Sequence, residues 1–265
     1  MENLIVLHSI DVIRRQYPTG EYPVLVMCSD MNHYICKYIR NSTSNQKLVC
    51  ELIGTKMAMI WELNVPAVAF VNIKPEHWPV SFVRPKIMTT MLGSKYLDSV
   101  EYVSPPNFDK LPQTKKMLSH LLKIALFDFW IANEDRNANN SNLLYDISNK
   151  RLVPIDFGCI LNNADFRYPM MQLTTNETII SSPLFKYLSN DISIQGLQKV
   201  KNDIRQSYAV NLSLCRNRID TVIEYMPEDW NVPKEVVTDK LSQLFEPDWT
   251  EGAWNNFEEC LNDNI

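Results

Sequence analysis

The apolar positions of the first forty residues predict β-strands. LIVLHSIDVI (4–13) and YPVLVMCS (22–29) are rich in β-branched residues, and HYICKYI (33–39) alternates apolar and polar positions with period two. A segment with proline and glycine separates the first two stretches, and SDMN separates the next two. Such residues favour turns, so we expect short strands joined by tight turns.

The hydrophobic period changes to three and four after residue 40, which indicates an amphipathic helix. Thr43 and Gln46 have the spacing of a capping box at the start of this helix. Pro66 is predicted to close it. The apolar residues that recur along the helix are Leu48, Val49, Leu52, Ile53, Met57, Ile60 and Trp61.

Two more strands are predicted after this helix, over AVAFVNI (67–73) and over a run at 81–92 that Pro85 interrupts. A polar stretch with several prolines follows at 98–113. Such a composition is typical of a connection between two structural units, and we place a boundary there.

The chain beyond the boundary has mainly helical periodicity. A helix is predicted over TKKMLSHLLKIALFDFWIAN, then a hairpin over NLLYD, ISNK and RLVPID, an irregular stretch at 159–181 and several helices over 183–262. Strands followed by helices favour an α+β fold. We expect a bilobal molecule with a strand-rich N-terminal lobe (1–97) that holds one helix, and a helical C-terminal lobe (98–265).

Composition and charge narrow the class of protein. Among 265 residues, 45 % are apolar and 22 % are charged, which is ordinary for a globular protein with a substantial core. The net charge of −5 offers no electrostatic case for nucleic acid as the main partner. None of the six cysteines is spaced as CxxC, which predicts buried free thiols in a reducing cytoplasm. We also expect no signal peptide and no membrane span.

A run of asparagines and carboxylates, NEDRNANNSNLLYD (133–146), stands out between the long helix and the hairpin. One interpretation is a solvated turn, because Asn and Asp side chains bond readily to nearby backbone. Another is a calcium loop, with Asp135 at position 1 and Asp146 at position 12 of an EF-hand pattern. Asn140 stands where that loop requires glycine, position 12 is not glutamate, and a hairpin follows in place of a helix. These departures disfavour calcium.

A third interpretation joins this run to three other positions. Lys37 lies in a predicted strand, Glu51 on the next helix, Asp135 and Asn140 in the Asn-rich run, and Asp156 in a DFG triplet. Phosphoryl transfer from ATP needs a lysine on the phosphates, a glutamate that holds it, an aspartate for the acceptor hydroxyl, and Asn and Asp ligands for magnesium. The kinase motifs occur in this order along a chain.

Each of these residues also has an ordinary structural interpretation. A lysine in an alternating strand usually faces solvent, a helical glutamate is common, and a lone DFG triplet occurs by chance. Lys37 shares one strand face with Ile35 and Ile39, so a partly buried lysine that needs a charged partner is also plausible. The order and context of the motifs favour the kinase interpretation.

FDFWIANEDRNANNSNLL followed by LVPIDFG resembles the HipA-like kinases, particularly the short stand-alone members. The resemblance extends over about residues 20–262. It implies a protein-kinase-like fold, distantly similar to phosphatidylinositol kinases, with ATP and Mg²⁺ in a cleft. It further implies that Lys37 contacts phosphates, that Glu51 pairs with Lys37, and that Asp135 is the catalytic aspartate. Asn140 and Asp156 would bind magnesium.

The resemblance also brings further residues to the cleft. Leu92 and Tyr96, in MLGSKYL, would lie in the segment that enters the nucleotide site. Asn142 would brace the loop, and Arg136 would buttress it by pairing with a carboxylate.

The first hairpin departs from the glycine-rich kinase motif, because Gly20 is its only glycine. The segment RRQYPTGE would have to cover the phosphates differently, for instance through Arg14 or Arg15.

The acceptor is not evident from the sequence, because no APE motif follows Asp156. We expect a Ser or Thr of a protein as the acceptor. A small-molecule or lipid kinase, and a non-catalytic pseudokinase that regulates a partner, remain alternatives. The resemblance also raises a toxin–antitoxin function with an antitoxin as partner, although the chain is shorter than the longer toxins of the family.

Overall fold

The computed structural model describes residues 4–40, 44–85, 87–174 and 178–265. Its N-terminal part is a six-stranded sheet with the strand order β1-β5-β6-β4-β3-β2. Only β1 and β5 run parallel, and the other neighbours are antiparallel. The strands are β1 Val6–His8, β2 Arg15–Gln16, β3 Val24–Met27, β4 His33–Lys37, β5 Val68–Asn72 and β6 Met91–Lys95.

Two predicted strands are shorter in the structure than the sequence pattern suggested. The stretch 4–13 forms a strand only at β1, and the stretch 81–92 joins the sheet only from Met91 onward. Pro85 has no N–H for a sheet ladder. The segment before it instead crosses the sheet, where the Val83 carbonyl accepts a hydrogen bond from the Tyr38 hydroxyl at 2.9 Å. The prediction of a strand over 81–90 is therefore wrong.

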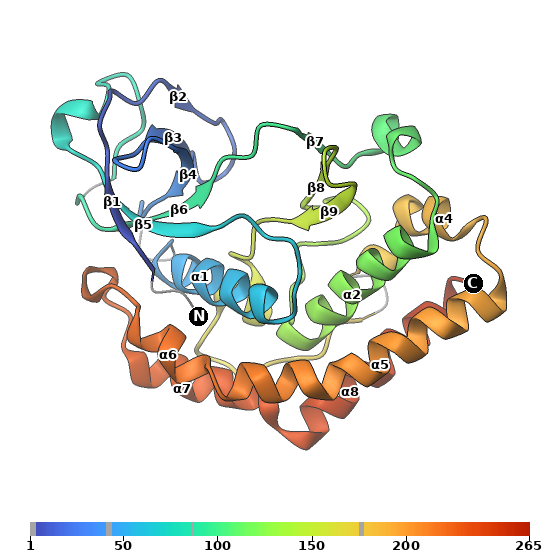
Figure 1. Ribbon diagram of the computed structural model, residues 1–265. Helices are drawn as coiled ribbons and strands as arrows, with labels where there is room; N and C mark the ends of the chain where they lie inside the picture. The colour runs from blue at the N-terminus through green and yellow to red at the C-terminus, as the bar shows by residue number, and fades with distance from the viewer. Residues whose placement is uncertain (1–3, 41–43, 86, 175–177) are drawn as a thin grey trace.

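Helix α1 (Ser44–Ile60) lies beside the sheet and also contacts the helical part of the chain (Figure 1). The prediction of this helix is confirmed, although it ends before Pro66, with Glu62 in a left-handed conformation at φ 57°. The proposed capping box involves Thr43, which lies outside the described residues.

The two faces of the sheet belong to different cores. One core contains Tyr34 and Cys36 of β4 with Trp78 from the segment that crosses the sheet. The other core contains Phe70 and Leu92 of the opposite face, the apolar side of α1 and most of the C-terminal helices. Helix α1 is therefore packed into the larger core together with the helical part.

A second, three-stranded sheet has the order β7-β8-β9 and follows the six-stranded sheet in the chain. Its strands are β7 Val100–Tyr102, β8 Leu143–Asp146 and β9 Arg151–Pro154. The antiparallel pairing of β8 with β9 confirms the predicted hairpin after the Asn-rich run.

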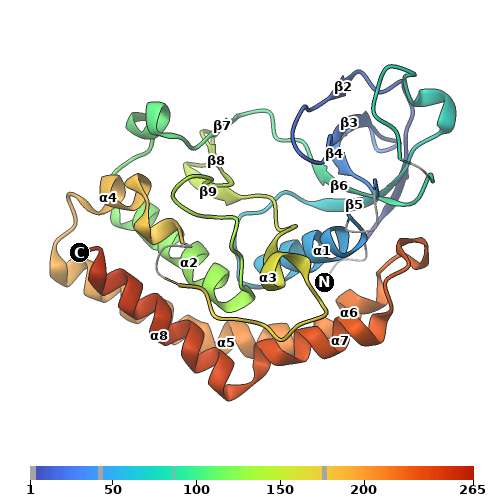
Figure 2. The ribbon, with the colours of Figure 1, turned by 180° about the vertical axis from the view of Figure 1, so that it is seen from behind.

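The rest of the chain is helical, as predicted (Figures 1 and 2). Helix α2 is the centre of this part, and α8, α5 and α4 pack against it. The helices are α2 Lys115–Ile131, α3 Ile160–Ala164, α4 Pro183–Ser189, α5 Ile194–Arg216, α6 Ile219–Glu224, α7 Lys234–Ser242 and α8 Pro247–Asp263, with short 3-10 turns η1 Pro75–His77, η2 Pro105–Lys110, η4 Ile179–Ser181, η5 Glu228–Trp230 and η6 Gln243–Phe245. The predicted α+β fold class is confirmed. In the described part of the chain, no helix has both the length and the apolar character needed to cross a bilayer.

Candidate active site

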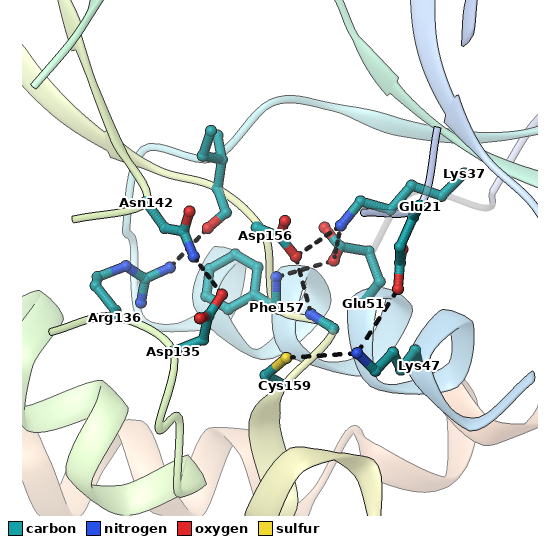
Figure 3. Close-up of polar contacts among 12 residues, drawn as sticks. Glu21, Lys37, Lys47, Glu51, Asp135, Arg136, Asn142, Asp156, Phe157 and Cys159 are labelled. Carbon is teal, nitrogen blue, oxygen red and sulfur yellow. Dashed lines mark hydrogen bonds and ion pairs between the residues drawn. The ribbon is translucent and has the colours of Figure 1, made fainter. Parts of the chain in front are cut away.

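Lys37 stands at the end of β4, on the sheet face that turns toward α1. Its side chain is 16 % exposed, and its ammonium contacts two carboxylates, Glu51 Oε2 at 2.8 Å and Asp156 Oδ1 at 2.7 Å (Figure 3). A buried lysine is stable in its charged form only with such partners. Glu51 and Asp156 follow Lys37 in the chain by 14 and 119 positions. The fold thus brings the three residues together, as the motif order suggested.

Glu51 also fixes the start of the DFG segment. Its Oε2 accepts a hydrogen bond from the Phe157 backbone N–H at 2.9 Å. Phe157 is buried and lies against Gly54, where an added Cβ would stand 2.8 Å from the ring atom Cγ. Helix α1 therefore contacts the DFG segment through one hydrogen bond and one close packing contact.

The charges of this cluster depend on one another. Burial opposes the charge of Lys37, but Asp156 and Glu51 outweigh burial and raise the pKa of the ammonium. Burial raises the pKa of Glu51, although Lys37 opposes that shift. For Asp156, burial is outweighed by Lys37, whose charge and hydrogen bond lower the pKa of the carboxyl. Lys37 and Asp156 are therefore both charged at neutral pH.

Asp156 combines an unusual backbone with an accessible side chain. Its φ is 60°, in the left-handed region that non-glycine residues rarely adopt. Such conformations cost about 1–3 kcal/mol and concentrate at functional sites. The side chain is 44 % exposed, so the carboxylate can reach a ligand while it contacts Lys37.

Asp135 follows directly from the end of α2. Ala132 has φ 52° and closes the helix, and the Asn133 N–H returns to the Asp128 carbonyl. Asp135 Oδ2 then accepts a hydrogen bond from Asn142 Nδ2 at 2.8 Å. The Asn142 carbonyl in turn accepts from the Ile155 N–H at 3.0 Å, which places Asn142 beside the residue that precedes Asp156.

Asn140 has a different environment from Asn142. Its side-chain oxygen accepts a hydrogen bond from the Tyr102 hydroxyl at 3.0 Å. Among the described residues, Asn140 forms no hydrogen bond with Lys37, Glu51 or Asp156. Its assignment as a metal ligand stays a prediction, and Asn142 is the asparagine that bonds Asp135 and the residue before Asp156.

Arg136 has the carboxylate partner that the sequence analysis anticipated. Its side chain is 0 % exposed and pairs with Asp128 of α2 through Nη1. Its Nη2 donates to the Ile155 carbonyl at 2.9 Å, and its guanidinium lies over the Phe157 ring at 4.9 Å. Arg136 therefore joins the helix before Asp135 to the segment that holds Asp156.

The loop around Gly20 joins β2 to β3 and lies near the cluster. The Gly20 carbonyl accepts a hydrogen bond from Arg40 Nη1 at 2.8 Å, and the Arg40 guanidinium lies over the Tyr22 ring at 4.7 Å. Arg14 pairs with Asp11 at 2.8 Å, and Arg15 lies over the Tyr17 ring at 4.4 Å. The described contacts of this loop therefore involve Arg40 more than the two arginines that the sequence suggested.

Leu92 and Tyr96, which were predicted to bind nucleotide, lie on and just after β6. Leu92 is 1 % exposed and pairs in register with Lys37. The Tyr96 N–H donates to the His33 carbonyl at 2.8 Å. Both residues adjoin β4, and their contact with a nucleotide stays a prediction.

Asp146 lies at the hairpin turn and not in a helical calcium loop. Its carboxylate accepts hydrogen bonds from Asn149 Nδ2 at 2.7 Å and from Arg151 Nε at 3.3 Å. Within the described residues, no group of three or more His, Cys, Asp and Glu side chains is arranged to hold a metal ion. A magnesium site of the kinase type does not need such a group, because substrate phosphates and water complete the coordination.

A family model matches residues 10–251, and its description is HipA-like kinase. The chain belongs to the HipA-like kinase family. Membership supports a kinase function for the chain.

A solved structure with the same fold is that of a Helicobacter pylori proinflammatory kinase, CtkA. The TM-score is 0.59 at 14 % sequence identity, and the match covers 97 % of this chain and 99 % of that chain. At this identity the likeness shows the fold alone, which is a kinase fold. No curated protein sequence matches the chain.

Two charged residues near the cluster were not found from the sequence. Lys47 of α1 lies 3.9 Å from Glu21 Oε1 of the Gly20 loop and 3.9 Å from Cys159 Sγ after the DFG segment (Figure 3). The spacing of Lys47 one helical turn before Glu51 was the available signal, since residues four apart share a helix face.

Proposed function

We propose that this HipA-like kinase transfers the γ-phosphoryl group of ATP, in the presence of Mg²⁺, to a Ser or Thr hydroxyl of a protein. The observation that carries this proposal is the double contact of Lys37 with Glu51 at 2.8 Å and with Asp156 at 2.7 Å. Such a lysine is held in place for phosphates by one carboxylate and lies beside the metal-binding carboxylate.

ATP would bind between the two parts of the chain, which we propose as a nucleotide lobe (1–97) and a catalytic lobe (98–265). Lys37 would donate to the phosphates, and Glu51 would hold the ammonium in position. The residues at the edge of β6, Leu92 and Tyr96, and the loop of Gly20 would border the nucleotide. Support comes from the pairing of β6 with β4, which places this edge beside Lys37.

Asp135 would orient the acceptor hydroxyl and accept its proton as the oxygen attacks phosphorus. The hydrogen bond from Asn142 to Oδ2 restrains one carboxylate oxygen of Asp135. The other oxygen remains for the acceptor. The hydrogen bond from Asn142 would therefore fix the orientation of the Asp135 carboxylate before the substrate binds.

The residues around Asp156 fit a magnesium ion, because carboxylate and amide oxygens are its preferred protein ligands. We propose Asp156 and Asn142 as the ligands that this chain supplies. The nitrogen of the Asn142 amide is engaged by Asp135, so its oxygen is the atom that could face a cation. When bound, magnesium would neutralise charge on the phosphates. Asn140, the ligand expected from the motif, is the alternative to Asn142.

A protein acceptor is supported by a hollow of about 80 Å³ beside the catalytic loop. Ala138 and Asn139 of that loop line it, together with Phe108 of η2 and Leu184 of α4. An apolar hollow next to the loop of Asp135 suits a side chain of an extended peptide. It stays a prediction that the chain acts as a toxin and that an antitoxin is its partner. Its location in the cytoplasm also stays a prediction.

The test of the proposed function is transfer of labelled phosphate from ATP to proteins of a cell lysate. We expect the native chain and Asp220→Asn, an exposed aspartate on α6, to label the same proteins, and Asp135→Asn to label none. Equal labelling by Asp135→Asn would contradict the catalytic role. Labelling of lipids or small molecules only would replace the protein acceptor, and ATP binding without transfer to any acceptor would favour a pseudokinase.

The choice between the two asparagines has its own test. We expect Asn142→Ala to raise the magnesium concentration needed for half-maximal transfer more than Asn140→Ala does, because Asn142 bonds Asp135 and the Ile155 N–H next to Asp156. The opposite ranking would restore the ligand that the motif spacing predicted.

A further inference from the structure

Lys47 is a second lysine beside the candidate active site. It lies one helical turn before Glu51 on α1, so both side chains project from the same side of the helix. Its backbone is close to the DFG segment, since a Cβ added at Gly158 would lie 3.8 Å from the Lys47 carbonyl oxygen. The side chain is 32 % exposed, which leaves the ammonium accessible to a ligand.

The charged partner of Lys47 is a residue of the Gly20 loop. Glu21 Oε1 and Cys159 Sγ each lie 3.9 Å from Lys47 Nζ. Burial raises the pKa of the Cys159 thiol to about 11, although Lys47 opposes that shift, so the thiol is neutral at neutral pH. Glu21 is therefore the anion that faces this ammonium.

Glu21 also acts on the rest of the cluster. Burial and the nearer charges have the larger effects on the pKa values of Lys37 and Glu51, and the negative charge of Glu21 acts to raise both pKa values. Figure 3 shows Glu21 beside the Lys37 side chain and above Lys47. The carboxylate thus lies within ion-pair distance of Lys47 and close enough to Lys37 for its charge to act on that ammonium.

The balance of charge favours exchange of Glu21 for another anion. Glu21, Glu51 and Asp156 bring three negative charges against the two positive charges of Lys37 and Lys47. A polyphosphate that entered this site would be repelled by Glu21 and attracted by Lys47. The ion pair of Lys47 and Glu21 is also weak. Both groups are partly exposed and lie 3.9 Å apart, and such a pair contributes at most about 1 kcal/mol.

We propose that Lys47 is a second phosphate-binding lysine. Glu21 forms an ion pair with Lys47 in the free protein, and the phosphates of ATP replace the Glu21 carboxylate when the nucleotide binds. The inference rests on the proposed function. It adds how a kinase whose Gly20 loop has a single glycine would contact the phosphates, through a lysine of α1. Arg40 holds the loop through the Gly20 carbonyl, so Glu21 can leave Lys47 by rotation of its own side chain.

The experiment compares the affinities of ATP and AMP for the native chain and for two variants, by calorimetry with Mg²⁺ present. Lys47→Met should weaken ATP binding about tenfold or more, the usual effect of one lost charge-assisted hydrogen bond, and leave AMP binding unchanged. Glu21→Gln should strengthen ATP binding, because it removes a competing anion. A misfolded fraction lowers the apparent number of sites per chain and not their affinity, so the ratio of ATP to AMP affinity is insensitive to it.

The matched controls are Lys123→Met and Glu62→Gln. Lys123 of α2 and Glu62 form another pair at 3.9 Å, near the opposite end of α1 and roughly 20 Å from Lys47 along the helix. Both controls should keep the native ratio. An unchanged ratio in Lys47→Met, or weaker ATP binding in Glu21→Gln, would overturn this inference while the native chain still bound ATP. Absence of ATP binding by the native chain would remove the proposed function and this inference with it.

Discussion

At the scale of single residues, the candidate site depends on charges that are buried and paired. Lys37 has two carboxylate partners, and Arg136 is fully buried against Asp128. Isolated charges in such positions would be expensive, so each partner keeps the other ionised. The first group forms the proposed nucleotide site, whereas the second joins the backbone segments that carry Asp135 and Asp156.

The buried pair of Arg136 and Asp128 leads to a prediction about stability. Asp128→Ala should lower the free energy of unfolding by about 3–5 kcal/mol, because it leaves the guanidinium buried without its counter-charge. Urea denaturation followed by circular dichroism measures the change. A loss below about 1 kcal/mol, the value of an exposed pair, would show that the pair is open to water in solution.

The control for this prediction is the double variant Asp128→Leu with Arg136→Met. Asp128 Oδ2 and Arg136 Nε have no hydrogen-bond partner among the described residues, so the pair is incompletely satisfied. Removing both charges together should therefore cost less than removing Asp128 alone. A loss equal to the sum of the two single variants would mean that the residues act independently.

At the scale of secondary structure elements, α1 joins Lys37 of the six-stranded sheet to the DFG segment. Lys47, Glu51 and Gly54 follow one another at helical spacing. Lys47 lies near Glu21 and Cys159, Glu51 bonds Lys37 and Phe157, and Gly54 admits the Phe157 ring. A shift of this helix would therefore disturb Lys37 and Asp156 together.

Gly54→Ala tests the close packing of α1 on Phe157. Alanine is normally better than glycine in a helix by about 1 kcal/mol. Here the new Cβ would lie 2.8 Å from Phe157 Cγ, and overpacking of this kind costs about 1–3 kcal/mol. We expect a lower melting temperature and slower phosphotransfer. Gly252→Ala on α8 is the control, because its nearest neighbour is the end of the Gln172 side chain, and stabilisation of both variants would contradict the packing argument.

His120 of α2 gives a prediction about pH. Burial, followed by the charges of Lys116 and Lys123 on the same helix and Arg151 on β9, lowers its pKa below the ordinary 6.5. As pH falls through about 6.5, the unfolded chain binds a proton at this site before the folded chain does, so the fold loses stability. The loss is complete below the folded-state pKa.

The measurement is the free energy of unfolding at pH 7.5 and pH 5.5 for the native chain and for His120→Asn. The native chain should lose more stability than the variant between these pH values, since all other groups are shared. An equal loss in both proteins would show that His120 titrates normally in the fold.

At the scale of the whole molecule, two cores meet at the six-stranded sheet. The smaller core lies on one face of the sheet, and the larger one runs from the other face through α1 to the C-terminal helices. Lys37 projects from the sheet, Glu51 from α1, and Asp156 follows the three-stranded sheet. A ligand that contacts all three links separate parts of the chain.

Binding of ATP with Mg²⁺ should therefore raise the melting temperature of the molecule. At a free concentration a hundred times Kd, the stabilisation is about 2.7 kcal/mol, or roughly 5–10 °C for a chain of this size. Differential scanning fluorimetry measures the shift. Asp156→Asn should lose most of the shift, and addition of a chelator to the native chain should have the same effect. A full shift in both cases would contradict the assignment of Asp156 to a metal.

Much of the architecture could be predicted from local sequence because the relevant forces are local. The amphipathic period of α1 and α2, the turn residues of the hairpins and the polar run after Ala132 each act within a few positions. The order of Lys37, Glu51, Asp135 and Asp156 along the chain was also sufficient to predict the kinase family, and the family match confirms that prediction, whereas the roles of these residues stay predictions. The extent of the strand over 81–92 was not predictable, since the segment around Val83 bonds to residues far away in sequence.

The sequence by itself determined the α+β class, the helices and the kinase family, because periodicity is a property of neighbouring residues and motif order can be read along the chain without its fold. Only the tertiary structure decided which polar residues meet. It placed Asn142, and not Asn140, against Asp135, gave Arg136 its partner Asp128, and brought Glu21 to Lys47. These contacts join residues from separate elements, and their energies depend on burial and distance, which no local pattern specifies.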